Sequence, residues 1–101
     1  MADNALLVKW DKPAFIAFQK IYDHIRKDSP INAEKVKQEI LAITKSLADY
    51  PERYPPDKFK TNNTGNYRAF EKYSYRVAYV YNGSEIRILR IRHVKQEPLR
   101  Y

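Results

Sequence analysis

Hydrophobic and polar residues change their spacing twice along this chain, and each change predicts a different kind of element. Apolar residues three or four apart predict amphipathic helices over Asp11–Lys27 and Ser29–Leu47. Alternating or short apolar runs predict strands instead. These runs cover residues 5–10 before the helices and residues 67–71, 73–81 and 85–93 after them. The expected order is therefore one strand, two helices and three strands.

The segment Asp49–Asn66 follows neither spacing. It holds three prolines and a Thr-Asn-Asn-Thr-Gly cluster, which predicts a loop of about eighteen residues. Loops of that length are uncommon in small domains and are often functional. With 101 residues the chain is the size of one domain. We expect a single α+β domain over residues 1–101, with a helical hairpin on one face of a mainly antiparallel sheet.

The dipeptide Asn82-Gly83 stands between the last two strand runs and is a strong hairpin signal. A type I′ turn centred on these two residues would place Tyr79 opposite Ile86. Because strand side chains alternate, the tyrosines and isoleucines would then share one face, which the helices would cover.

The opposite face of the hairpin is expected to be open. This register places Arg76, Arg87 and His93 there, whereas Arg90 and Arg92 would emerge beside the helices. A solvated sheet face is the commoner explanation of charged strand residues. A basic binding or catalytic surface is the alternative.

The amino-acid composition limits which partners and which kinds of site the protein can have. Nineteen Lys and Arg against twelve Asp and Glu give a net charge of +7, which favours polyanions or acidic proteins as partners. The absence of cysteine excludes disulfides, zinc–thiolate sites and cysteine nucleophiles, and two histidines leave little for a metal, so no metal or cofactor is expected. The start "MADNALLVKW" does not resemble a signal peptide, and no apolar run is long enough to span a membrane. We expect a cytoplasmic protein without a membrane partner.

Several segments in this order resemble the RelE/ParE toxin family of bacterial toxin–antitoxin modules. They are "FQKIYDHI...NAEKVKQEIL", "NTGNYR", "YRVAY" and "IRILRIRH", and the similarity extends from Leu6 to Tyr101. The resemblance implies a compact α+β toxin and a cognate acidic antitoxin whose segment wraps around it.

The family has two branches, and the sequence leaves both open. One branch contains ribosome-dependent mRNA endonucleases that need no metal, with the ribosome and mRNA as partners. The other contains ParE toxins, which poison DNA gyrase without nuclease chemistry. We expect the first activity, with the gyrase inhibitor as an alternative and a non-toxic basic RNA-binding module as a third. Whether the chain is an enzyme is therefore open.

The resemblance to the nuclease branch implies a catalytic set of Arg76, His93, Asp57, Lys60 and Tyr101. A base, Asp57 or Tyr101, would take the proton from the ribose 2′-hydroxyl, and His93 would protonate the leaving oxygen. Arg76 and Lys60 would stabilise the charge that grows on the phosphate. Arg76→Ala should then lower the rate without unfolding the protein.

The same resemblance suggests an RNA-binding set around these residues. It comprises Arg87, Lys95, Tyr67 and Lys58. Tyr67 and Ala69 stand where some family members carry a pair of lysines, and this departure weakens the match to that subgroup.

Overall fold

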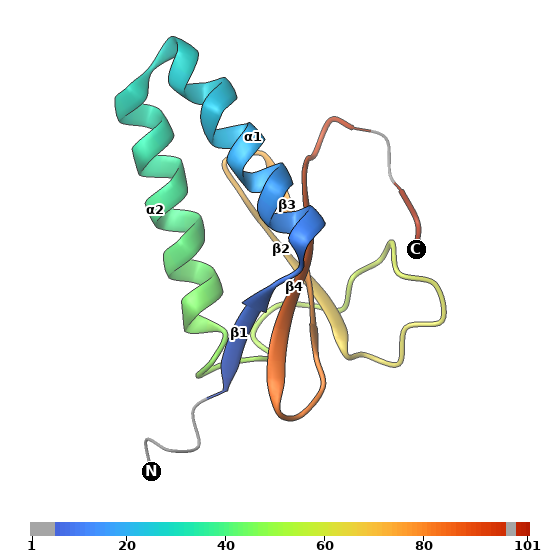
Figure 1. The fold of residues 1–101 in the computed structure, drawn as a ribbon. Helices are drawn as coiled ribbons and strands as arrows, with labels where there is room; N and C mark the ends of the chain where they lie inside the picture. Colours follow the sequence, from blue (N-terminus) through green and yellow to red (C-terminus); the bar gives the residue numbers. More distant parts are fainter. Residues whose placement is uncertain (1–5, 97–98) are drawn as a thin grey trace.

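The predicted order of elements is confirmed. The computed structural model describes residues 6–96 and 99–101, so the predicted start of the first strand at Ala5 lies outside the described residues. The elements are β1 (Leu7–Trp10), α1 (Lys12–Asp28), α2 (Pro30–Ser46), β2 (Tyr67–Lys72), β3 (Tyr75–Tyr81) and β4 (Glu85–His93) (Figure 1). Ser29 separates the two helices; its hydroxyl oxygen accepts a 3.1 Å bond from the Asn32 amide, and Pro30 follows at the first helical position.

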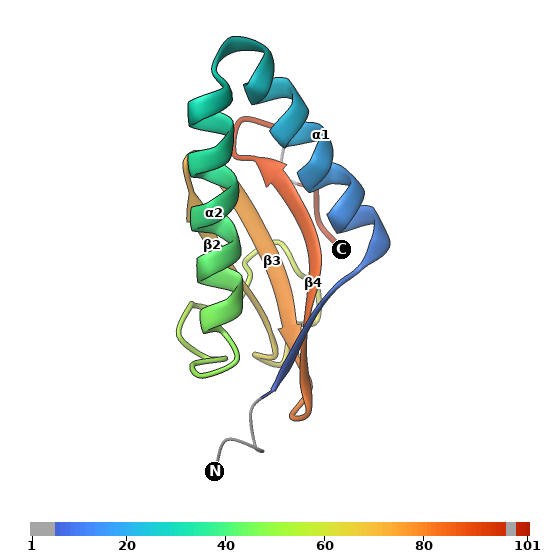
Figure 2. The ribbon, with the colours of Figure 1, turned by 60° about the vertical axis from the view of Figure 1, so that its left-hand side comes forward.

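The four strands form one sheet in the order β1-β4-β3-β2. β1 runs parallel to β4, and the other neighbours are antiparallel. α1 and α2 form a hairpin that covers one face of the sheet (Figures 1 and 2). This is the α+β architecture that the sequence predicts.

The core lies between the helices and this face. Its fully buried members include Ile40, Leu47, Val77, Tyr79, Ile86 and Ile88. The Tyr79 hydroxyl crosses to the long loop and donates a 2.8 Å hydrogen bond to the Pro51 carbonyl. Burial raises the pKa of Tyr79 to about 12, so its phenol stays protonated and continues to donate this bond.

The turn between β3 and β4 differs from the prediction by one residue. Asn82 pairs with Glu85 through a 3.3 Å backbone bond, which leaves Gly83 and Ser84 at the centre. Gly83 has a φ of +95°, whereas Asn82 is not among the residues with positive φ. The Asn82 side chain instead accepts bonds from the amides of Ser84 and Glu85, at 3.0 Å each. This side-chain cap moves the turn one position along the chain.

The strand register changes with the turn and then changes again. Tyr79 faces Ile88, not Ile86 as predicted. The next pair is Ala78 with Arg90, so Leu89 is an extra residue on β4 and forms a β-bulge. One extra residue reverses which face the later side chains occupy.

The bulge overturns two predictions about faces. Arg76 lies opposite Arg92, so both point away from the helices, as does Arg90. His93 lies opposite Tyr75 on the helix side, and their rings meet edge to face at 5.3 Å. By strand pairing, the prediction that His93 shares a face with Arg76 is wrong, and so is the prediction that Arg90 and Arg92 lie on the helix-covered face. At the end of β4, Arg92 does reach a hollow that α1 lines, and His93 also lines the cavity beside Arg76.

The face expected to be open is partly covered. The loop from Leu47 to Asn66 runs along the outer edge of β2, where Pro56 bridges to Arg68. The loop then reaches the chain's last residues: the Tyr101 amide donates to the Phe59 carbonyl at 3.0 Å. The two segments lie side by side in Figure 1. In the part of the chain that the structure describes, no helix is both long and apolar enough to cross a membrane.

Candidate functional site

Asp57 is the centre of the covered face. It is 2% exposed, and its carboxylate accepts bonds from Arg76 Nη2 at 2.8 Å, the Tyr101 hydroxyl at 2.6 Å and the Phe59 amide at 3.0 Å. Burial alone would raise the pKa of Asp57. The hydrogen bonds from Tyr101 and Arg76 outweigh that effect and hold the pKa below its ordinary value. Asp57 is therefore a hydrogen-bonded anion at neutral pH.

Arg76 bridges two acidic side chains. It contacts Asp57 on one side, and its Nη1 lies 2.9 Å from Glu71 Oε2 on the other. Its guanidinium also packs over the Phe59 ring at 4.9 Å. Desolvation lowers the pKa of Arg76, but the two carboxylates raise it by more, so the guanidinium stays charged. Its charge is balanced within the fold by these carboxylates.

Tyr101 closes the cluster from the other end of the chain. Its carbonyl accepts bonds from the Thr61 amide at 2.6 Å and the Thr61 hydroxyl at 2.7 Å. Burial and the neighbouring Asp57 raise the pKa of Tyr101 above its ordinary value, so the phenol stays neutral. A neutral phenol that donates to a carboxylate is poorly placed to act as a base.

Lys60 lies against the aromatic wall of the same cluster. Its Nζ is 4.5 Å from the centre of the Tyr67 ring and 5.5 Å from that of Tyr101, and it donates to the Thr61 carbonyl at 3.0 Å. Four of the five residues of the predicted catalytic set therefore come together. His93, on the helix side of β4, does not join them.

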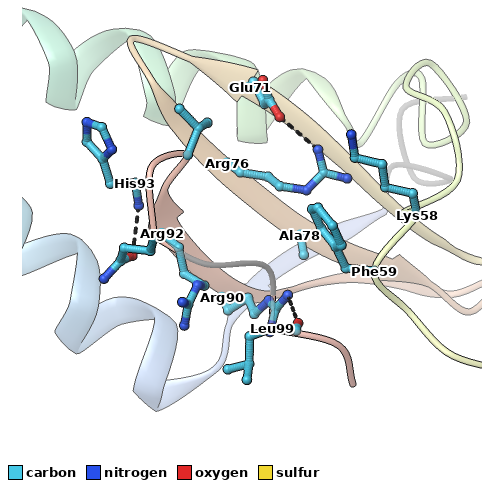
Figure 3. A pocket seen from close by; sticks show the side chains of 11 residues that line it. Lys58, Phe59, Glu71, Arg76, Ala78, Arg90, Arg92, His93 and Leu99 are labelled. Carbon is cyan, nitrogen blue, oxygen red and sulfur yellow. Dashed lines mark hydrogen bonds and ion pairs between the residues drawn. The ribbon is translucent and has the colours of Figure 1, made fainter.

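A small cavity of about 140 Å³ opens beside this cluster. Figure 3 shows Arg76, Arg90 and Arg92 reaching into its surroundings from neighbouring strands, with Lys58 from the loop. Arg90 donates to the Leu99 carbonyl and packs over the Tyr101 ring at 4.2 Å. The predicted register placed Arg90 and Arg92 beside the helices and not on this surface. Because Arg90 and Arg92 are two positions apart on one strand, the sequence does predict that they share a face of the sheet. The β-bulge determines which face that is.

The predicted RNA-binding residues lie at several places on the molecule. Lys58 lines the cavity, Tyr67 lies under Lys60, and Lys95 lines an adjoining hollow near α1. Arg87 is held at the β1 side of the sheet by Asp11 at 2.7 Å and Glu85 at 3.2 Å. Neighbouring carboxylates raise the pKa of Arg87.

The described residues around Asp57 and Arg76 are charged, but no general acid and general base face each other among them. The Asp57 carboxylate is a hydrogen-bonded anion and the Tyr101 phenol is neutral. The expected acid, His93, pairs with Tyr75 at the strand end and reaches only the rim of the cavity. Among the residues that the structure describes, no three His, Cys, Asp or Glu side chains are grouped so that they could hold a metal ion. What the surface can do is attract an anion to its arginines.

A family model described as the ParE toxin of type II toxin-antitoxin system, parDE, matches residues 8–98. The chain belongs to this toxin family. It is thus the toxin of a type II toxin–antitoxin system, and an antitoxin is its partner.

A solved structure agrees with this assignment. It is titled as the chromosomal ParDE TA system from P. aeruginosa and superposes with a TM-score of 0.68 at 25% sequence identity. The match covers 89% of this chain and 97% of that one. A search among curated proteins gave no significant match. The resemblance to the RelE/ParE family that the sequence suggested is confirmed.

Proposed function

We propose that this ParE-family toxin arrests growth by poisoning DNA gyrase and does not cut mRNA. The observation that carries the proposal is the state of Asp57, the residue expected to be the nuclease base. Three donors hold its buried carboxylate, and its pKa is lowered. An efficient general base needs a pKa near the working pH, and this environment moves the pKa in the opposite direction.

The position of His93 supports the same choice. Cleavage by the 2′-hydroxyl needs a base and an acid on opposite sides of one phosphate. His93 is on the helix side of β4, in edge-to-face contact with Tyr75, whereas Asp57 is on the other side of the sheet. His93 reaches the rim of the arginine cavity, but its Nδ1 accepts a 3.0 Å bond from the Lys95 amide, which holds the imidazole at the end of β4 and not against Asp57.

The experiment uses the purified toxin with gyrase and closed circular plasmid DNA. We expect loss of supercoiling and accumulation of gyrase-linked DNA breaks, both prevented by prior addition of the antitoxin. In parallel, mRNA on translating ribosomes should remain intact. Discrete mRNA cuts together with normal supercoiling would reject the proposal and favour the nuclease.

The antitoxin is proposed to be acidic, as the toxin's net charge of +7 would favour. Expression of this chain alone should stop bacterial growth, and co-expression of the antitoxin should restore it. Normal growth at high expression of the folded chain would count against a toxin of either kind.

A further inference from the structure

A second hollow lies on the other side of the end of β4, between that strand and α1. Its volume is about 510 Å³. Ile21, Tyr75 and Ile91 contribute apolar surface, and Lys20, His24 and Lys95 contribute basic or imidazole side chains. None of the described residues that line it is acidic. We call this hollow the β4–α1 groove.

The lysines of the β4–α1 groove differ from the arginines described above. Lys20 and Lys95 are exposed, and within residues 6–96 and 99–101 neither forms an ion pair. Arg76 and Arg87, by contrast, are each held by two carboxylates. The positive charge of the two lysines is therefore not balanced by an ion pair within the described fold.

The groove continues into the arginine cavity. Arg92, His93 and Gln96 line both hollows, and Figure 3 shows His93 and Arg92 beside each other at the end of β4. The joint surface passes from Lys58 in the loop, around the end of the sheet, to Lys20 on α1. Glu71 is the one acidic residue among the described residues lining either hollow, and it is paired with Arg76.

We propose that the β4–α1 groove, with the adjoining cavity, binds the sugar–phosphate backbone of duplex DNA. The inference rests on the proposed function, because a gyrase poison works beside the DNA that gyrase holds. Along α1 the lining residues run from Ala17 to His24, which spans about 10 Å at 1.5 Å per residue. One DNA strand rises about 3.4 Å per phosphate along the duplex axis, so a groove of this length that lies along that axis spans about three phosphates.

The groove suits an acidic peptide less well. β3 lies between β4 and β2, and β1 pairs with β4 over Glu85–Ile88, so among the described residues β4 offers an added peptide strand only the short edge from Leu89 to His93. On α1 the apolar lining is limited to Ala17 and Ile21, which lie one helical turn apart. A docked peptide helix uses apolar anchors over two turns or more. The groove has lysines around a short apolar surface, and this arrangement suits the regularly spaced phosphates of DNA better than it suits an acidic peptide.

The test measures fluorescence anisotropy of a labelled duplex of about 20 base pairs with purified toxin and no gyrase. Binding should weaken steeply between about 50 and 200 mM salt, as for other phosphate contacts. The variant Lys20→Gln/Lys95→Gln should lose affinity, and its salt slope should fall by about two units. The matched control Lys35→Gln/Lys45→Gln changes the same charge at two exposed positions of α2 and should bind as wild type does.

Three outcomes would overturn the inference. They are the absence of DNA binding by the wild type, equal losses in both double variants, and tighter groove-dependent binding of a polyglutamate peptide than of DNA. The gyrase assay separates this inference from the proposed function. A toxin that traps gyrase on DNA but does not bind DNA alone refutes only the groove. A toxin that binds DNA through these lysines but leaves gyrase unaffected refutes only the gyrase proposal.

Discussion

The hydroxyl of Tyr101 donates a 2.6 Å hydrogen bond to the carboxylate of Asp57, which lies 44 positions earlier in the chain. The Asp57 side chain has no solvent-accessible surface. Its negative charge is therefore stabilised by protein donors in place of water, and the loss of one donor is costly. The pair joins the end of the described chain to the long loop, and the covered face of the sheet depends on it.

Tyr101→Phe should destabilise the fold without removing the ring contacts. Hydrogen bonds to charged groups contribute about 1.5–3 kcal/mol, and we expect the free energy of unfolding to fall by that amount. Urea denaturation measures it. Tyr50→Phe is the control, because Tyr50 is 62% exposed. Equal losses in the two variants would show that the Asp57 bond contributes nothing specific.

Acid should remove the contribution of Asp57. A carboxyl whose folded pKa is depressed stabilises the fold fully above the pKa of an unfolded aspartate, about 3.9. This contribution is lost as pH falls through the lower folded pKa. Wild type should be more stable than Asp57→Asn at pH 7, and the gap in unfolding free energy should narrow below about pH 4. A gap that stays constant down to pH 2 would contradict the depressed pKa.

Arg76→Ala should destabilise the protein, contrary to what the sequence suggested for an arginine on an open face. It leaves Asp57 buried without its cationic partner, and breaking such pairs costs about 3–5 kcal/mol. The double variant Arg76→Ala/Asp57→Asn removes the stranded charge and should recover part of the loss. Thermal unfolding of the two single variants and the double variant forms the cycle. Additive losses would mean that the two residues are not coupled.

The hairpin illustrates how far the sequence could predict the fold. Apolar spacing, the Ser29–Pro30 start of α2 and the Asn-Gly turn signal are local features, and the elements follow from them. The exact position of the turn does not follow from the local sequence in the same way. The Asn82 side chain can cap the turn or adopt positive φ, and the choice moves the register.

The positions of the candidate-site residues depend on features that the alternation of side chains along a strand cannot predict. The extra residue Leu89 moves Arg90 and Arg92 to the face of Arg76 and moves His93 away from it. A bulge depends on packing across the sheet, and nothing in the run "EIRILRIRH" distinguishes it from a regular strand. The grouping of Asp57 with Arg76 came from the family resemblance. Their burial and the closure by Tyr101 required the structure.

Gly83→Ala should test the corrected turn. Gly83 has a φ of +95°, and no atom lies within 4 Å of an added Cβ, so the cost is backbone strain alone. We expect a loss of about 1–2 kcal/mol in the free energy of unfolding. Ser84→Ala, at the other central position, should cost less because Ser84 lacks positive φ. The opposite ranking, measured by urea denaturation, would argue against this turn.

Lys60→Ala separates the two kinds of toxin inside a cell. In a nuclease that uses Lys60 to stabilise the phosphate, losing one such donor would lower the rate roughly 10²–10³-fold. In the gyrase poison proposed here, Lys60 packs on Tyr67 and Tyr101 and has no chemical role.

We therefore expect Lys60→Ala to arrest growth at an inducer dose within about twofold of wild type. Arrest should be scored at matched soluble protein levels, so that a stability effect is not mistaken for a catalytic one. Lys58→Ala is the wrong control, because Lys58 lines the arginine cavity. Lys45→Ala on α2 changes the same charge elsewhere. If Lys60→Ala alone abolished the arrest while remaining folded and abundant, the cluster around Asp57 would have to be considered a catalytic centre again.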